Sequence, residues 1–123
     1  MNSTEIGNIG EKSVCDYLVE KGYTIIARNY RIRGGEIDII ATDADYIVFV
    51  EVKTRKPNSI SGGFDSVNAK KQHLIIKTAS DYCSKYPVDL QPRFDIAEVI
   101  IINGNVQSID YIKNAYDTTG YNY

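Results

Sequence analysis

The sequence predicts an α/β fold in which a mixed central sheet of about five strands is flanked by helices. Two stretches carry apolar residues at helical spacing, and five shorter stretches are rich in β-branched residues or alternate between apolar and polar ones. They follow in the order helix, three strands, helix, two strands. This order predicts a meander of strands and then a helix that crosses over to the remaining strands.

The first helix is predicted over Thr4 to Lys21, with Gly22 as its stop. Apolar residues recur there at intervals of one helical turn. Gly7 and Gly10 weaken the pattern, which indicates close packing, or the close approach of a ligand, on that side of the helix.

Three strands are predicted next, and the last of them is the strongest strand pattern in the chain. They cover Thr24 to Tyr30, Glu36 to Thr42 and Tyr46 to Thr54, with turns at 30–35 and 43–45. The third strand begins with residues that are apolar on both faces, as in a central strand buried on both sides.

The second half of the chain is predicted to contain a helix and a hairpin. A polar loop is expected over Arg55 to Phe64, and the helix over Ser66 to Tyr86. Two strands, Arg93 to Ile102 and Val106 to Ile112, are expected to join at Asn103-Gly104-Asn105. We assign residues 1–113 to a single domain and residues 114–123 to a Tyr-rich C-terminal tail.

The composition argues against several classes of protein. No run approaches the roughly 20 apolar residues of a membrane span, and the N-terminus lacks the apolar segment of a secretory signal. A cytoplasmic protein with no membrane partner is therefore expected. Cys15 and Cys83 lie far apart without a CxxC spacing, so we expect both in the core. The single histidine, His73, excludes any site that needs two.

Charge is distributed unevenly along the chain. The formal net charge is −2, yet between Lys21 and Lys77 ten basic residues outnumber six acidic ones. A basic rim around an acidic centre suits an enzyme that acts on a phosphate backbone. Scattered surface charge accounts for the same counts equally well.

Four charged residues lie on the two predicted strands at the centre of the chain. Glu51 and Lys53 are two positions apart and share a face of the third strand. Glu36 and Asp38 are expected to share a face of the second strand, with Ile37 and Ile39 on the other. If these strands pair, Asp38 lies close to Glu51, and the two carboxylates repel unless a cation such as Mg²⁺ lies between them.

These residues match a known motif. Glu36-Ile37-Asp38, followed after twelve residues by Glu51-Val52-Lys53, resembles the PD-(D/E)xK signature of restriction-endonuclease-like proteins. Nearly the whole chain resembles the uncharacterised YraN-like family, and it also resembles the archaeal Holliday-junction resolvases. The other matching segments are Gly10-Glu11, Arg28-Asn29-Tyr30, residues 35–38, the helix around Lys70, and Arg93-Phe94-Asp95.

The resemblance implies a restriction-endonuclease-like domain with the active site at one edge of a mixed sheet, Mg²⁺ or Mn²⁺ as cofactor, and DNA as the substrate. It implies that Asp38 and Glu51 bind the metal and that Lys53 is the catalytic lysine. It also implies that Glu11 of the first helix is an additional acid at the metal.

Two features depart from the family patterns. Ile37 stands where the motif has its proline. Gln72 is followed four residues later by Ile76, where exonuclease-like relatives have a tyrosine. The second departure argues against an exonuclease.

Basic side chains near the predicted strand ends, and one on the second predicted helix, are candidates for contact with nucleic-acid phosphates. They are Arg31, Arg33, Arg55, Lys56 and Lys70. Loops and helix surfaces are commonly charged, so an ordinary surface role for these side chains stays open.

Structural roles stay open for other candidates too. Glu51 and Lys53 could form a strand-end ion pair worth about 0–1 kcal/mol. Glu11 could belong to a charged helix face. Arg93 and Asp95, at alternate positions of one strand, could be a structural pair near the core.

The sequence therefore predicts a metal-dependent nuclease, a Mg²⁺-dependent endodeoxyribonuclease, with branched or damaged DNA among its candidate substrates. One alternative is a nucleic-acid-binding accessory protein that keeps the fold and does little chemistry. The other is a Holliday-junction resolvase, which has to be a homodimer to make two symmetric cuts.

Overall fold

The computed structural model describes residues 1–57 and 67–118 of the chain. Its elements are α1 (Ser3–Glu20), β1 (Thr24–Ile32), β2 (Gly35–Asp43), β3 (Tyr46–Arg55), α2 (Ala69–Lys85), β4 (Gln91–Ile102) and β5 (Asn105–Tyr116). This confirms the predicted order of helices and strands. Most of the predicted loop from Arg55 to Phe64, and the end of the predicted tail, lie outside the described residues.

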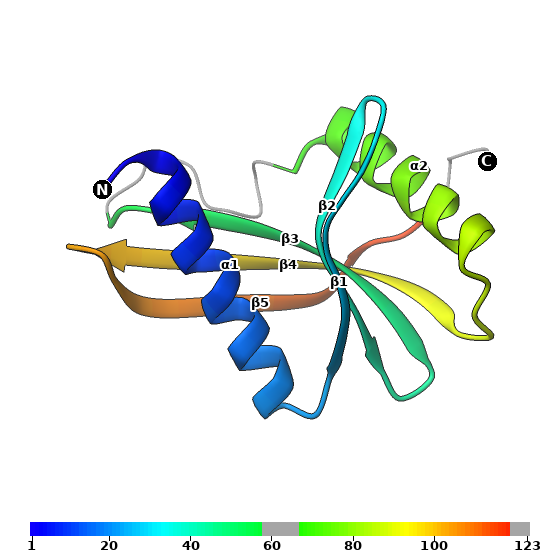
Figure 1. Ribbon diagram of the computed structural model, residues 1–123, viewed down its shortest axis with the longest axis horizontal. Helices are drawn as coiled ribbons and strands as arrows, with labels where there is room; N and C mark the ends of the chain where they lie inside the picture. The colour runs from blue at the N-terminus through cyan, green and yellow to red at the C-terminus, as the bar shows by residue number, and fades with distance from the viewer. Residues whose placement is uncertain (58–66, 119–123) are drawn as a thin grey trace.

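The strands form a five-stranded mixed sheet in the order β1-β2-β3-β4-β5. β1, β2 and β3 pair antiparallel, β3 and β4 pair parallel, and β4 and β5 form an antiparallel hairpin. α2 makes the crossover between the two parallel strands, as Figure 1 shows. The predicted α/β class with a mixed sheet is confirmed, and the arrangement is consistent with a restriction-endonuclease-like fold.

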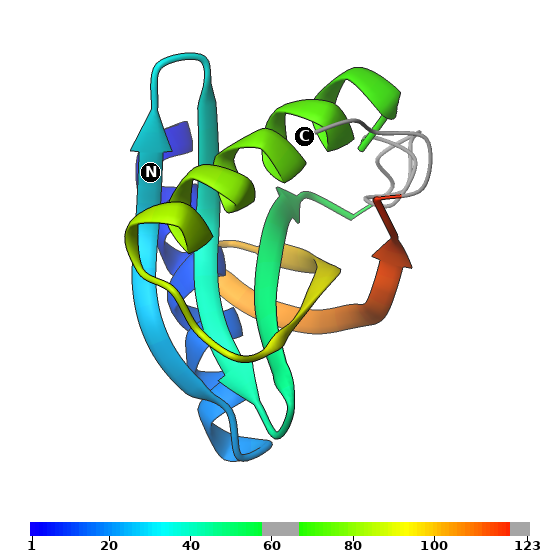
Figure 2. The same cartoon turned by 90° about the vertical axis from the view of Figure 1, so that its right-hand side faces the viewer.

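The helices lie on opposite faces of the sheet (Figure 2). We call these faces the α1 side and the α2 side. The α1-side core includes Val14, Leu18, Ile39, Val48 and Val50. The α2-side core includes Ile40, Ile47, Phe49, Ile75 and Phe94. Successive residues of β3 therefore alternate between two buried cores, as predicted for a central strand.

Asparagines fix where both helices begin. The side chain of Asn2 accepts a hydrogen bond from the Glu5 amide at 2.8 Å, and that of Asn68 accepts one from the Lys71 amide at 3.0 Å. The second helix thus begins three residues later than the predicted Ser66. Neither α-helix of the described ranges combines the length and hydropathy that crossing a bilayer requires.

β5 extends to Tyr116, beyond the predicted end at Ile112. The Asn114 amide donates a hydrogen bond to the buried carboxylate of Asp95 at 2.9 Å. The Tyr116 ring then stacks on Phe94, with ring centroids 5.3 Å apart. Residues 114–116 of the predicted tail therefore belong to the sheet, because polar and aromatic contacts to β4 replace an aliphatic pattern.

Candidate functional site

The candidate site forms where β2 and β3 stop pairing. The last pair at this end of the two strands is Ile39↔Val50, and Asp38 and Glu51 are the next residues beyond it. The Asp38 carboxylate accepts a hydrogen bond from the Val52 amide at 2.8 Å. The carboxylate thus bridges to the neighbouring strand, where regular pairing has ended.

The backbone is irregular beside Asp38. Asn29 of β1, which lies next to this part of β2, has a left-handed φ of 54°. Ile37 belongs to the α2-side core, whereas Ile39 belongs to the α1-side core. The prediction that Ile37 and Ile39 share a face is therefore wrong, because the irregularity interrupts the two-residue alternation of a regular strand. Asp38 lies at the position where the faces exchange.

Glu51 is a buried carboxylate held by two lysines. Its side chain is 8% exposed, and its Oε1 lies 3.4 Å from the Lys53 ammonium and 2.6 Å from that of Lys71. Lys53 comes from the same strand, as the predicted shared face requires. Lys71 comes from α2 across the α2 side. The strand-end ion pair that was open as a structural role therefore has a third member, Lys71, and only its carboxylate, that of Glu51, is buried.

Burial and neighbouring charges shift the pKa values of Asp38, Lys53 and Lys71. Burial raises the pKa of Asp38 to about 7, and the negative charge of Glu51 adds to this effect. The hydrogen bond from the Val52 amide acts in the opposite direction and lowers the pKa. Burial and the nearby Lys71 lower the pKa of Lys53. Burial alone would lower the pKa of Lys71, but its bonds to Glu51 outweigh burial and raise it. The site therefore contains a carboxyl that exchanges its proton near neutral pH.

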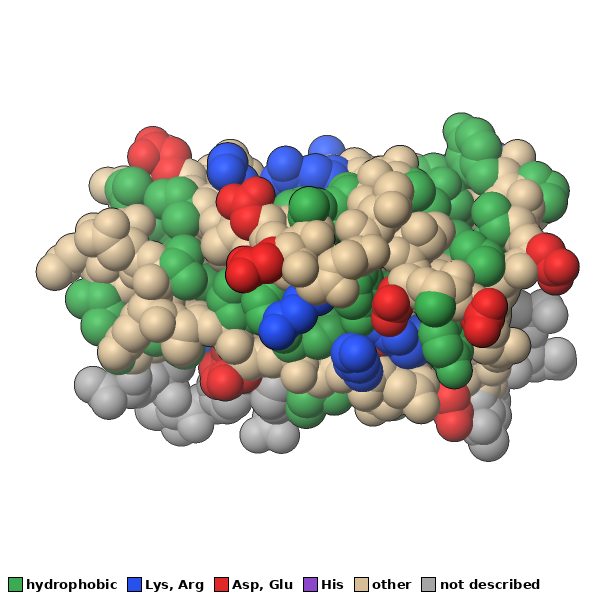
Figure 3. Space-filling view, turned by 90° about the horizontal axis from the view of Figure 1, so that it is seen from below, with side chains coloured by type: hydrophobic (Ala, Val, Ile, Leu, Met, Phe, Trp, Pro, Cys, Tyr) green, Lys and Arg blue, Asp and Glu red, His purple; other side chains and the backbone are tan. Residues whose placement is uncertain are grey.

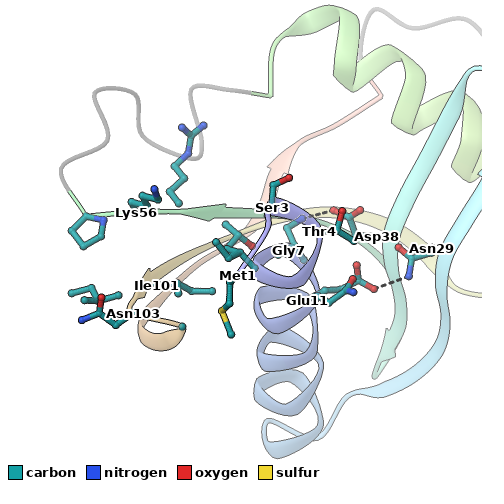
Figure 4. Close-up of a pocket in the computed structure, with 18 of the residues that line it drawn as sticks. Met1, Ser3, Thr4, Gly7, Glu11, Asn29, Asp38, Lys56, Ile101 and Asn103 are labelled. Atoms are coloured by element: carbon teal, nitrogen blue, oxygen red, sulfur yellow. Dashed lines mark hydrogen bonds between the residues drawn. The ribbon is translucent and has the colours of Figure 1, made fainter.

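Glu11 approaches the site from α1. It is buried, and one of its carboxylate oxygens accepts hydrogen bonds from Arg28 and from the Asn29 side chain, both at 3.0 Å. A Cβ on Gly10 would overlap the Thr54 hydroxyl of β3, so glycine lets the helix come this close. This confirms the predicted close packing at Gly10. Figure 4 shows Glu11 bound to Asn29 on the side of the cleft where Asp38 lies.

Two clefts meet at Asp38. The larger, of about 1070 Å³, lies on the α1 side and includes Glu11, Asn29, Thr54 and the start of α1. The smaller, of about 490 Å³, lies on the α2 side and includes Glu51 and Lys71. Their linings share Glu36, Asp38 and Val52. The Asp38 carboxyl therefore borders both clefts.

The donor set suits a hard divalent ion. Among residues 1–57 and 67–118, no group of three or more acidic, histidine or cysteine side chains is arranged to hold a metal ion. Mg²⁺, however, is commonly bound through one or two carboxylates, with water and substrate phosphates completing its shell. Asp38 and Glu51 supply two such carboxylates, and the mutual charge that raises the pKa of Asp38 is what a cation relieves. The residues present therefore fit such an ion.

The predicted phosphate-binding residues lie in three places. Arg31 and Arg33 are exposed at the β1–β2 turn, and Arg31 pairs with Glu36 at 3.2 Å. Lys70 is exposed at the start of α2. The remaining two, Arg55 and Lys56, line the α1-side cleft at the end of β3.

Lys71 was not among the residues predicted from the sequence. A signal for it exists, because Lys71 precedes the buried Ile75, Thr78 and Tyr82 at intervals of one helical turn. That spacing places it on the inward stripe of α2, whereas Lys70 lies one position to the side. A lysine on an otherwise apolar stripe needs a buried partner, and Glu51 provides it.

Arg93 and Asp95 of β4 form a buried structural network. The Arg93 guanidinium donates to Asp95 at 2.9 Å, to Asp43 at 3.0 Å and to the Tyr23 hydroxyl at 2.7 Å. The Tyr111 hydroxyl donates to Asp95 at 2.6 Å. Of the two open roles for Arg93 and Asp95, these contacts support the structural one. Of the remaining residues singled out, Cys15 is buried, Cys83 half-buried and His73 exposed.

Comparisons with known proteins place the chain in a family. The model of the uncharacterised protein family UPF0102 matches residues 10–99. A UPF0102 protein of Clostridium tetani is 46% identical over 120 residues, covering 94% of this chain and 98% of that protein. UPF0102 proteins of Alkaliphilus metalliredigens and Trichlorobacter lovleyi are 44% and 43% identical, covering 93% and 91% of this chain and 99% and 90% of those proteins. The matched residues include Glu11, Asp38, Glu51, Lys53 and Lys71.

Proposed function

The chain belongs to the uncharacterised protein family UPF0102, which is the YraN-like family that its motifs resemble, and on the geometry of its site we propose that it is a metal-dependent nuclease that hydrolyses phosphodiester bonds of DNA. One observation carries the proposal. Asp38 and Glu51 come together at the opening between β2 and β3, with the Lys53 ammonium 3.4 Å from Glu51. Two acids and a lysine on adjacent strands are the arrangement that the motif requires.

In the proposed mechanism, Asp38 and Glu51 would hold a Mg²⁺ or Mn²⁺ ion, which would polarise the scissile phosphate and lower the pKa of a bound water. Lys53 positions the attacking water, and its ammonium offsets the charge that builds up on the phosphate. Its lowered pKa also lets it exchange a proton with that water more readily than an exposed lysine does.

Glu11 acts in this proposal from the α1 side, as the additional acid. In the present arrangement its carboxylate orients Arg28 and Asn29. It thereby holds β1 in the irregular conformation next to Asp38. Glu11 thus keeps the opening in the sheet in place and can contribute a negative charge to the cation in the same cleft.

The basic residues around the clefts are the proposed contacts to the DNA backbone. Arg55 and Lys56 border the α1-side cleft, and Arg31 borders the α2-side cleft. We propose Arg33 and Lys70, both exposed, as peripheral contacts. On the face seen in Figure 3, basic and acidic side chains are interspersed rather than separated into patches of one sign. Because the formal net charge of the chain is −2, binding is expected to depend on these particular side chains more than on overall charge.

The direct test is a cleavage assay with the purified protein. Linear, nicked, flapped and four-way DNA are incubated with Mg²⁺, with Mn²⁺ and with a chelator. Cleavage that needs the ion and disappears in Asp38→Asn and in Lys53→Ala supports the proposal. Asp16→Asn serves as the matched control, because Asp16 is exposed on α1 and pairs with the exposed Lys12. Full activity of both site variants rules out this site.

A second candidate function follows from the pairing of Glu51. Two ammonium groups, those of Lys53 and Lys71, already contact this carboxylate and offset its charge. Such an arrangement suits an accessory protein that binds nucleic acid and does little chemistry. Salt-sensitive DNA binding without cleavage under any divalent ion would favour it. Cleavage of four-way DNA by a homodimer would instead identify a junction resolvase.

A further inference from the structure

Lys71 contacts Glu51 from a different element. The Lys71 ammonium belongs to α2 and lies 2.6 Å from Glu51 Oε1, closer than the Lys53 ammonium at 3.4 Å. The Lys71 side chain is 37% exposed, compared with 19% for Lys53. The tighter of the two ion pairs is thus made by the lysine with more access to solvent.

The backbone of Lys71 is fixed even though its side chain is long. Its amide donates to the Asn68 cap of α2 at 3.0 Å. A Cβ on Gly35 would overlap the Thr78 hydroxyl, so α2 packs closely on the start of β2. The helix therefore holds Lys71 at one place beside the α2-side cleft, while four side-chain carbons leave its ammonium free to change partners.

The charges at the site balance before any ion arrives. When Asp38 is ionised, the negative charges of Asp38 and Glu51 are matched by the ammonium groups of Lys53 and Lys71. A divalent ion added to this balanced set leaves two surplus positive charges. Either a cationic side chain leaves the carboxylates, or an anion joins them.

We propose that Lys71 is an exchangeable counter-ion of Glu51, which yields the carboxylate to a divalent ion and binds a phosphate group of the DNA instead. Metal and DNA then bind cooperatively. The ion replaces Lys71 at Glu51 and so frees the ammonium for a phosphate, and the bound phosphate keeps the ammonium from competing with the ion for Glu51. The inference rests on the proposed function and adds a positioning residue to it. Lys53 stays in place, because it lies on the same strand as Glu51 and is more deeply buried.

The α2-side cleft offers the place for that phosphate. Lys71 lines it together with Arg31 of the β1–β2 turn and Gly34 and Gly35. Arg31 pairs with Glu36, which lines this cleft too, so the Lys71 ammonium is the group proposed to bind the phosphate, and the Gly34-Gly35 turn leaves room for it. Glu51 lines the same cleft, so the ammonium changes partners within one cavity.

The first measurement is Mn²⁺ affinity of the free protein, followed by electron paramagnetic resonance. Lys71→Met is expected to bind Mn²⁺ about tenfold more tightly than the unmodified protein, equivalent to about 1.4 kcal/mol. Lys71→Arg restores the positive charge and should return the affinity close to its original value. Lys77→Met, at another exposed position of α2, is the matched control and should leave the Mn²⁺ affinity unchanged.

The second measurement is binding of a labelled DNA duplex by fluorescence anisotropy, with Ca²⁺ as the ion and with a chelator. The unmodified protein is expected to bind DNA about tenfold more tightly with Ca²⁺, and Lys71→Met only about twofold more tightly. A purely structural role for Lys71 would shift both affinities together and leave this ratio unchanged.

Each outcome has a distinct meaning. Equal Mn²⁺ affinity of Lys71→Met and the unmodified protein, weaker binding by Lys71→Met, or no Mn²⁺ binding by any variant overturns the inference. Bound Mn²⁺ without DNA cleavage defeats the proposed nuclease but leaves the exchange at Lys71 standing. If cleavage depends on the metal but Ca²⁺ strengthens DNA binding by the same factor in Lys71→Met as in the unmodified protein, the proposed nuclease stands and the exchange at Lys71 is overturned.

Discussion

The carboxylate of Asp38 accepts a hydrogen bond from the Val52 amide at 2.8 Å, across the gap that opens where β2 and β3 stop pairing. The contact satisfies a backbone donor that has lost its place in the ladder. It also keeps Asp38 partly buried near Glu51, and this combination raises the pKa of Asp38 to about 7. The site thus lies where the pairing of β2 and β3 is interrupted, and the Asp38 carboxyl group bridges the two strands there.

The first prediction concerns pH and Asp38. Because its pKa is about 7 in the folded protein and 3.8 ordinarily, the folded state binds a proton more tightly than the unfolded state does. The stability that this proton contributes is complete below about pH 4 and is lost as the pH rises to about 7. Asp38→Asn keeps an acceptor for the Val52 amide and does not titrate. As the pH rises across this range, the free energy of unfolding of Asp38→Asn should therefore increase relative to that of the unmodified protein, by a few kcal/mol at most.

Urea unfolding without divalent ions, at about pH 5 and about pH 8, measures this difference. Asp16→Asn, at an exposed position of α1, is the control and should show no such dependence on pH. A constant difference between Asp38→Asn and the unmodified protein would contradict the predicted pKa of Asp38.

The second prediction concerns the metal. A divalent ion between Asp38 and Glu51 favours the ionised carboxyl, so Mg²⁺ should lower the pKa of Asp38 well below about 7. Titration of the carboxyl carbon by nuclear magnetic resonance, with Mg²⁺ and with KCl of equal ionic strength, measures the change. An Asp38 that titrates alike in both solutions would mean that the ion binds elsewhere.

The third prediction compares two glycines of α1. A Cβ at Gly10 would overlap the Thr54 hydroxyl, whereas a Cβ at Gly7 would have no atom within 4 Å. Gly7→Ala should stabilise the protein by up to about 1 kcal/mol through helix propensity. Gly10→Ala should destabilise it by about 1–3 kcal/mol, because the helix has to move away from β3.

Thermal unfolding of the two alanine variants measures the contrast. Adding Thr54→Ala to Gly10→Ala removes the nearest atom and should recover part of the loss. Since Glu11 follows Gly10, Gly10→Ala should also weaken DNA cleavage more than Gly7→Ala does. Equal effects of the two substitutions would show that α1 is not held closely against β3.

The fourth prediction concerns the buried network of Arg93. Arg93→Met would leave the Asp95 carboxylate, which is 0% exposed, without its cation. The expected loss is about 3–5 kcal/mol, as for other broken buried pairs. Lys12→Met, which breaks an exposed pair of α1, should cost no more than about 1 kcal/mol. Chemical unfolding of both variants measures the difference, and a mild effect of Arg93→Met would contradict a structural role.

The order of the elements could be predicted from the sequence because strand and helix periodicities are local. Glu51 and Lys53 were correctly predicted to share a face, since β3 is regular and its residues alternate without interruption. The turn at 43–45 was also predictable from its composition, and Ala44 there has a left-handed φ of 51°. In each case, neighbouring residues alone carry the information.

Other features depend on contacts between distant segments. The end of β5 could not be predicted, because Asn114 and Tyr116 are held by Asp95 and Phe94 of β4. The faces of Ile37 and Ile39 were predicted wrongly, because the irregularity beside Asp38 lies in β1 as well, at Asn29. A pattern within one strand contains no signal from the strand beside it.

The sequence by itself determined the order of helices and strands, the mixed sheet, the family and the residues Asp38, Glu51 and Lys53 as a related set. Only the tertiary structure decided that Lys71 of α2 holds Glu51, that Glu11 is tied to β1, and that Asp38 closes the gap between two strands. The physical reason is that alternation along a chain fixes only the direction of a side chain. Its partner is fixed by how closely the elements pack, and here Gly10 and Gly35 set those distances.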